Sequence, residues 1–169
     1  MTDQTQRLVE LYDELIERLY ETKLELEKSS QALDLEEEIE RLIEIEQGIE
    51  RLTLDEASLL STWLKRDLKD LRSYLVETGK GVHEWLAQES HLLGEQFIHW
   101  LKQVADPTLL DARTLEEDLA SRENPPLYHA GELAMAGRFI CSSCEKPVQV
   151  VATSRLDACH RCDGRVFIR

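Results

Sequence analysis

Every cysteine of the chain lies in one stretch near the C-terminal end of the sequence, in two pairs of identical spacing. Two residues separate Cys141 from Cys144, and two separate Cys159 from Cys162, with fourteen residues between the pairs. Two thiolates spaced in this way reach one ion from a tight turn, and two such turns complete a tetrahedron. The pattern therefore predicts one structural zinc ion per chain, bound by these four cysteines. A site closed by four protein ligands argues against catalysis by a zinc-bound water.

Other uses of this stretch stay open at this point. A redox Cys-x-x-Cys normally stands alone at the start of a helix in a thioredoxin-like setting, whereas these pairs lie among strand-like residues. An iron site of the rubredoxin type uses the same four ligands, and spacing does not distinguish it from zinc. His160 lies inside the second pair and could replace a thiol, but we expect it to face solvent in a turn. For His129, ahead of the cysteines, we expect a hydrogen-bonded strand position.

The elements that position the cysteines are short. Apolar runs at 138–140, 148–151 and 166–168 are typical of strands and place residues 127–169 in a zinc-ribbon domain. A module of 43 residues is too small to rely on a hydrophobic core alone, so metal binding would supply much of its folding energy. Gly164, just after the second pair, is expected to adopt the positive φ that such turns often need.

The preceding residues, 1–126, have the periodicity of an acidic helical region. We predict helices near 4–51, 54–78 and 82–105, and a short helix near 109–121. The first contains two apolar stripes that are out of phase, so we expect a stutter, a kink or a short break near Ser29-Ser30. The first stripe comprises Leu8, Tyr12, Leu15, Leu19, Thr22, Leu26, Ser29 and Leu33, and the second comprises Leu35, Ile39, Leu42, Ile45, Ile49 and Leu52. Thr53 and Glu56 form a capping-box pattern for the next helix.

The predicted fold is therefore mainly α with a small β module: a long antiparallel helical hairpin or small coiled-coil-like bundle, followed by a C-terminal zinc ribbon. Its formal charge of −14 is uneven. Residues 1–52 contribute −10, residues 53–126 contribute −6, and residues 127–169 contribute +2. An acidic arm of this kind repels nucleic-acid phosphates. We interpret its charge as that of a solvated helix face, and a docking surface for a basic partner is the alternative.

No other pattern points to chemistry. His91, Glu95 and His99 are spaced for one helix face and could bind a second metal, but we expect them to form an exposed polar stripe. Trp63, Trp85 and Trp100 are interpreted as packing anchors. The sequence has no glycine-rich phosphate loop, no G-x-S-x-G element and no H-E-x-x-H helix. We therefore predict no catalytic residues, no organic cofactor and no small-molecule substrate.

The C-terminal residues resemble a known family. The run Tyr128-His129-Ala130-Gly131-Glu132, the following stretch to Gly137 and the two Cys-x2-Cys pairs are similar to the YbeL-like zinc-ribbon proteins of bacteria, and 52–68 looks like their central helix. The resemblance covers roughly residues 50–169. It implies a helical N-terminal part joined to a ribbon, with zinc ligands at the four cysteines, and no established activity. Ribbons often have proline after the third cysteine and glycine after the fourth, where this chain has His160 and Asp163.

These observations predict a non-enzymatic interaction or adaptor protein with a structural zinc ion. Its partners would be proteins, including a second copy of the chain bound through the helical arm. The alternative is a zinc-ribbon protein associated with nucleic acid or the transcription machinery, which the charge disfavours. No secretory signal is evident, and no run approaches the roughly 20 apolar residues that span a bilayer. We therefore expect a soluble, cytoplasmic protein with no membrane contact, whose thiols stay reduced.

Overall fold

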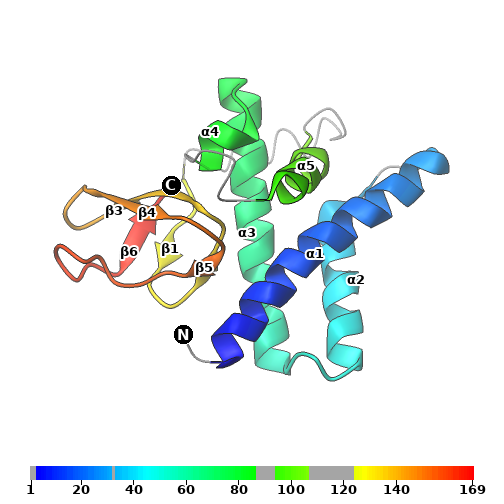
Figure 1. The fold of residues 1–169 in the computed structure, drawn as a ribbon, viewed down its shortest axis with the longest axis horizontal. Helices are drawn as coiled ribbons and strands as arrows, with labels where there is room; N and C mark the ends of the chain where they lie inside the picture. The colour runs from blue at the N-terminus through cyan, green and yellow to red at the C-terminus, as the bar shows by residue number, and fades with distance from the viewer. Residues whose placement is uncertain (1–2, 32, 87–93, 107–123) are drawn as a thin grey trace.

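The computed structural model describes residues 3–31, 33–86, 94–106 and 124–169. It is mainly helical, with a small antiparallel β module at the C-terminal end, as predicted (Figure 1). The helices are α1 (Asp3–Lys28), α2 (Leu35–Gly48), α3 (Leu54–Thr78), α4 (Val82–Leu86) and α5 (Glu95–Val104). The β module lies on one side of α3 and α2 and α5 lie on the other, while α1 crosses α3 and reaches the β module with its N-terminal half (Figure 1).

The region predicted as helical over 4–51 contains two helices, so of the expected alternatives the structure has the break. Helix α1 ends at Lys28, and Ser30 adopts a left-handed φ of 57°, which an α-helix cannot continue through. Helix α2 then starts afresh, because the side chain of Asp34 accepts a hydrogen bond from the backbone N–H of Glu37. The change of phase in the apolar pattern therefore marks a complete break.

Helix α3 begins and ends as its sequence indicates. The Thr53 hydroxyl accepts from the N–H of Glu56, and the Glu56 carboxylate accepts from the N–H of Thr53, which completes the capping box. At the other end, Gly79 has a left-handed φ of 63°, a conformation that glycine adopts without a Cβ clash.

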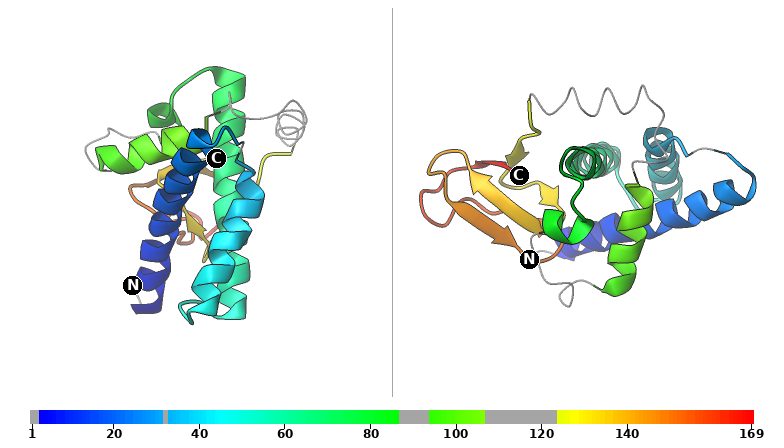
Figure 2. Two further views of the ribbon diagram at one scale, coloured as in Figure 1. Left: turned by 90° about the vertical axis from the view of Figure 1, so that its right-hand side faces the viewer. Right: turned by 90° about the horizontal axis from the view of Figure 1, so that it is seen from above.

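Helices α2 and α3 form an antiparallel pair, and α1 crosses them obliquely (Figure 1). Helix α5 packs against α1, as the two views in Figure 2 also show. Trp63 and Trp85 are buried in the shared core and Trp100 packs at its edge, as expected of packing anchors. Of the helix predicted over 82–105, the described residues form α4 and α5. Residues 87–93 and the predicted helix near 109–121 lie outside the described residues.

The second apolar stripe is only partly buried. Leu35, Ile39, Leu42 and Leu52 enter the core, but Ile45 and Ile49 are 38% and 59% exposed. Glu46 takes the buried position between them, where Arg18 and Arg51 both pair with its carboxylate. A buried carboxylate is tolerated when it is paired in this way, and its burial turns the two isoleucines outward.

The β module contains two small sheets. The first has the order β1 (Tyr128–His129), β6 (Val166–Ile168), β3 (Gly137–Cys141) and β4 (Pro147–Val150), with every neighbouring pair antiparallel. The second pairs β2 (Leu133–Ala134) with β5 (Ser154–Arg155). The three strand-like runs seen in the sequence correspond to β3, β4 and β6.

The ribbon does not have a core entirely of its own. Tyr128, Phe139, Val150 and Phe167 form a small apolar cluster inside it. Leu133, Met135 and Ala136, from the β2–β3 stretch, instead belong to the same buried cluster as the helices. The ribbon and the helices therefore pack as one body at α3. Within the described part of the chain, no helix is both long enough and apolar enough to cross a membrane.

Candidate metal centre and the helix–ribbon junction

The structure brings the four predicted cysteines together at the tip of the ribbon. Their Sγ atoms all lie within 4.8 Å of one another. Cys141 Sγ lies 3.6 Å from Cys162 Sγ, and Cys144 Sγ lies 3.8 Å from Cys159 Sγ. Zinc–sulfur bonds of about 2.3 Å give tetrahedral edges of about 3.8 Å, so the sulfur positions fit one zinc ion.

Two equivalent turns present these sulfur atoms. In the first, the N–H of Glu145 donates to the carbonyl of Cys141; in the second, the N–H of Asp163 donates to the carbonyl of Cys159. Glu145 and Asp163, each directly after a Cys-x2-Cys pair, both have a left-handed φ of 56°. The two pairs therefore have the same backbone geometry as well as the same spacing.

Gly164 is needed for a different reason from the one its position suggested. The positive φ expected there is found at Asp163 instead. A Cβ on Gly164 would lie 2.8 Å from Cys141 Sγ, closer than side-chain carbons approach, and 3.1 Å from Cys162 Sγ, which is also a tight contact. The missing side chain makes room for two of the ligands, and Asp163 fits the left-handed position because aspartate tolerates it better than most residues.

The electrostatics of the cluster favour a bound cation. Backbone N–H groups of Cys144 and Ser143 lower the pKa of Cys141 to about 6. The N–H of Gly164 also lowers the pKa of Cys162, but burial and hydrogen bonding with the other three thiols raise it to about 12. Crowded thiolates of like charge resist joint ionisation, and a divalent metal removes that resistance.

The histidines lie apart from this cluster. His160 is exposed in the second turn and is not among the grouped ligand atoms, which agrees with a turn residue that faces solvent. His129 is in β1, and its Nδ1 lies 3.3 Å from the carboxylate of Glu132, which also accepts from the His129 backbone N–H. Four cysteine thiols, and no histidine, form the metal centre of the described chain.

The second metal site considered from the sequence does not assemble in the described residues. His91 lies outside them. Glu95 and His99 line a shallow pocket of about 230 Å³ with His83 of α4, a residue that the sequence did not single out. The ligand atoms of these three residues do not all lie within 4.8 Å of one another, and His99 Nε2 lies 3.3 Å from the hydroxyl of Tyr20.

Sequence reasoning missed the buried polar contacts that join the ribbon to the helices. Asp67 of α3 is fully buried and accepts three hydrogen bonds: 2.7 Å from the Tyr12 hydroxyl, 2.9 Å from the Met135 backbone N–H and 3.0 Å from Arg66 Nε. A second contact joins α1 to the end of the β4–β5 turn, where Thr153 donates to Asp13 at 2.8 Å. The sequence feature that could have indicated this junction is Asp67 itself, an aspartate within the apolar face of α3, three residues after Leu64.

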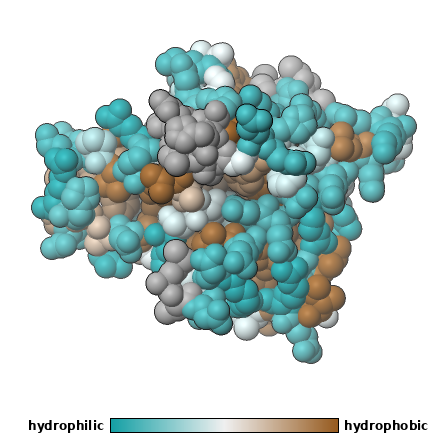
Figure 3. All heavy atoms as spheres, viewed as in Figure 1, coloured by the Kyte–Doolittle hydropathy of each residue, from teal (hydrophilic) through white to brown (hydrophobic). Residues whose placement is uncertain are grey.

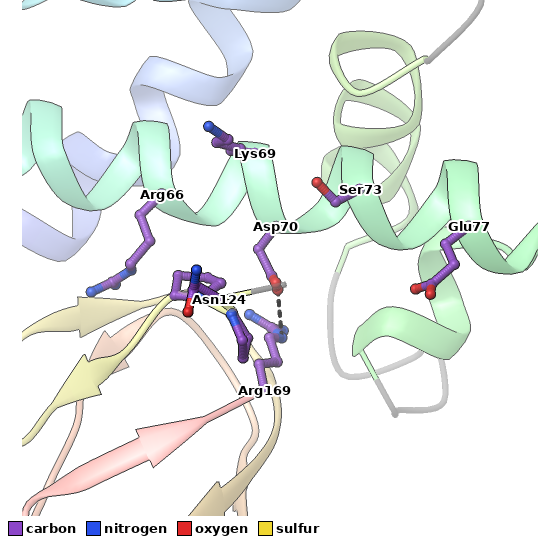
Figure 4. A pocket seen from close by; sticks show the side chains of 9 residues that line it. Arg66, Lys69, Asp70, Ser73, Glu77, Asn124 and Arg169 are labelled. Atoms are coloured by element: carbon purple, nitrogen blue, oxygen red, sulfur yellow. Dashed lines mark ion pairs between the residues drawn. The ribbon is translucent and has the colours of Figure 1, made fainter. Parts of the chain in front are cut away.

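Two arginines add to this junction (Figure 4). Arg66 donates to the Glu132 carboxylate and to the carbonyl of Leu133, and its guanidinium carbon lies 4.0 Å above the Tyr128 ring. Arg169 donates to the carbonyl of Ala136, and its guanidinium carbon lies 3.3 Å from the centre of the Trp85 ring. Cation–π stacking of this kind is strongest where the guanidinium is shielded from water.

A four-thiolate site on a short antiparallel sheet, packed against helices, defines a zinc-ribbon protein with a structural metal. The chain belongs to the family described as the zinc-ribbon containing domain, whose model matches residues 22–169. The matched region includes most of the helices as well as the ribbon, in agreement with their shared core. Comparison with curated proteins and with solved structures gives no match. The prediction of one structural zinc ion per chain is confirmed.

Proposed function

We propose that this chain is a non-enzymatic adaptor of the cytoplasm, in which the zinc ribbon and the acidic helices together bind a basic protein partner. The observation that supports it best is the composition of one exposed face of α2. This α2 outer face comprises Glu37, Arg41, Glu44, Ile45 and Ile49, all of which are exposed.

The α2 outer face combines negative charge with apolar anchors. Arg41 is engaged by Glu38 of the same helix, so its positive charge does not offset the acidic side chains. Ile45 and the C-cap residue Ile49 lie four residues apart and form an exposed apolar patch at the end of α2, whose other exposed side chains are hydrophilic. Figure 3 shows a mostly hydrophilic helical surface with hydrophobic areas, in brown, at its edge. A basic segment with apolar side chains at helical spacing would complement this face.

The metal centre supports a structural role for the ribbon. Four thiolates fill the coordination sphere of zinc and leave no position for a substrate or water. The buried junction holds the ribbon in a fixed orientation relative to α1 and α3. The ribbon would thus provide a second, rigid contact surface for the partner.

The test is a pull-down from the native cell with purified tagged chain, followed by direct binding measurements with each purified candidate. The double variant Glu37→Lys/Glu44→Lys should lose a partner whose binding also weakens with salt, because the attraction is between exposed charges. Glu84→Lys on α4 is the matched control, since Glu84 is also an exposed helical glutamate. Cys141→Ser reports whether the ribbon is needed.

Equal binding by the wild type and the double variant would exclude the α2 outer face as the partner site. Light scattering of the purified chain would show whether the partner is a second copy, as a mass twice that of 19.6 kDa.

A second candidate, nucleic-acid binding through the ribbon, is supported by five exposed cations on that module: Arg138, Lys146, Arg155, Arg161 and Arg165. The formal +2 of residues 127–169 falls to about zero when a zinc ion with four thiolates is counted as −2. Filter binding at two salt concentrations separates the candidates. Affinity for nucleic acid that falls steeply with salt would support this function over the adaptor role.

A further inference from the structure

The four ligands of the metal centre differ in exposure. Cys141 and Cys159 are buried, at 0% and 1% exposure, whereas Cys144 is half-buried and Cys162 is exposed. We call Cys144 and Cys162 the outer cysteines, and Cys141 and Cys159 the inner cysteines. The two turns that carry them lie at the end of the ribbon that points away from the helices (Figure 1). A small molecule in solution can therefore reach the metal centre at the outer cysteines.

Each outer sulfur atom lies against an inner sulfur atom of the other turn. Cys162 Sγ is 3.6 Å from Cys141 Sγ, and Cys144 Sγ is 3.8 Å from Cys159 Sγ. A disulfide bond is about 2.05 Å long, so each pair has to close by less than about 2 Å to form one. An accessible thiolate with a second cysteine beside it is the arrangement typical of redox-sensitive cysteines.

We propose that the metal centre is a redox switch, in which a hydroperoxide oxidises Cys162 and Cys141 then completes a disulfide. Cysteines that ligate a metal are held as thiolates, which are the nucleophilic form. The Cys162 thiolate attacks the hydroxyl oxygen of the peroxide. An S–O bond forms and the O–O bond breaks, which leaves a sulfenic acid on Cys162, and the departing oxygen takes a proton from solvent.

The second step uses the inner cysteine. The Cys141 thiolate attacks the oxidised sulfur of Cys162, an S–S bond forms, the S–O bond breaks and hydroxide leaves. The two sulfur atoms together lose two electrons, and the peroxide gains them. The disulfide removes two of the four ligands and thereby releases the ion, because Cys144 and Cys159 alone do not complete a zinc site. A dithiol reductant and Zn²⁺ restore the starting state.

Strand β3 connects this switch to the helices. Cys141 is its last residue, and Ala136, directly before its first residue, belongs to the buried cluster shared with the helices. In the same stretch, the Met135 N–H donates to Asp67 of α3 at 2.9 Å. A ribbon without zinc loses the folding energy that the metal supplies, so oxidation loosens its packing against α3. This switch does not depend on the binding of a partner to the α2 outer face.

The test treats the zinc-loaded full chain with excess hydrogen peroxide at pH 7.5 and follows free zinc with a chromogenic chelator. We expect one zinc ion per chain to be released, faster than in buffer alone. After free thiols are alkylated, peptide mass spectrometry should identify the first disulfide as Cys141–Cys162. The melting temperature of the helices, followed by circular dichroism, should fall as zinc is released and recover with dithiothreitol and Zn²⁺.

Two variants test the order of the steps, with dimedone as the reagent that labels sulfenic acid. Cys141→Ser removes the partner of Cys162, so labelling of Cys162 should increase several-fold. Cys159→Ser is the matched control: it also removes one inner ligand, but from the other pair, so labelling of Cys162 should stay low. The proposal is overturned if peroxide releases zinc no faster than buffer alone or if the first disulfide excludes Cys162. Equal labelling of Cys162 in the two variants, or an oxidised chain that melts like the zinc-loaded one, would also overturn it.

Discussion

Replacing Asp67 with alanine should destabilise the whole chain by about 3–5 kcal/mol. The substitution removes the acceptor for the Tyr12 hydroxyl and the Met135 N–H, both buried, and the carboxylate partner of Arg66. Each orphaned buried donor costs about 1–3 kcal/mol, although Arg66 keeps Glu132 and the carbonyl of Leu133. The sum agrees with the cost of about 3–5 kcal/mol for breaking a buried ion pair.

Urea unfolding of the zinc-loaded chain, followed by far-ultraviolet circular dichroism, gives this free energy. A double-mutant cycle with Tyr12→Phe tests the cause. In the wild-type background Tyr12→Phe should cost about 1–2 kcal/mol, but with Asp67→Ala it should cost little, because it removes a hydroxyl that has already lost its acceptor. The reasoning is refuted if Asp67→Ala costs less than about 1 kcal/mol, or if Tyr12→Phe costs the same in both backgrounds.

Three further predictions follow from the metal centre and the junction. Removing zinc with a chelator should lower the melting temperature of the helices by about 10 °C or more, because Leu133, Met135 and Ala136 belong to their core; an unchanged helical melting curve would contradict the shared core. Gly164→Ala should weaken zinc binding in a competition assay, because its Cβ would meet Cys141 Sγ at 2.8 Å, whereas Gly94→Ala, with open space around it, should not. Asp13→Asn should stabilise the chain by about 1–3 kcal/mol at pH 7.5, because burial raises the pKa of Asp13 from 3.8 to about 6. The folded state binds the proton more tightly, so wild-type stability from this group falls as pH rises from about 4 to 6 and stays low above it. The gain of Asp13→Asn should therefore shrink by about half at pH 5, and a gain that is equal at the two pH values would rule out this titration.

The parts of the fold that depend on local chemistry could be predicted from the sequence. The spacing of the cysteines predicted the metal centre, because two turns of fixed geometry need no knowledge of distant residues. The capping box at Thr53 and the strands of the ribbon could be predicted for the same reason, because each depends on residues that are close in the sequence. The break near Ser30 was visible only as a change of phase, which a kink would also produce.

The junction could not be predicted, because its contacts join residues far apart in the chain. An aspartate within an apolar face, such as Asp67, shows that some partner must exist but does not identify it. The exposure of Ile45 and Ile49 could not be predicted either, because it depends on a contact of Glu46 with Arg18, a residue distant in the sequence. Apolar periodicity assigned them to the core, and only the pairing of Glu46 with Arg18 and Arg51 shows why a charged residue replaced them there.

The bond between Asp13 and Thr153 joins residues 140 positions apart, which affects how the chain is made. During synthesis α1 and α3 leave the ribosome before the ribbon does, so Asp13 and Asp67 must stay hydrated until their partners Thr153 and Met135 arrive. Contacts of such sequence separation are slow to form, because a long loop must close first. The nascent bundle therefore cannot complete its core alone, and capture of zinc by the ribbon, which is made after the helices, becomes the step that completes it.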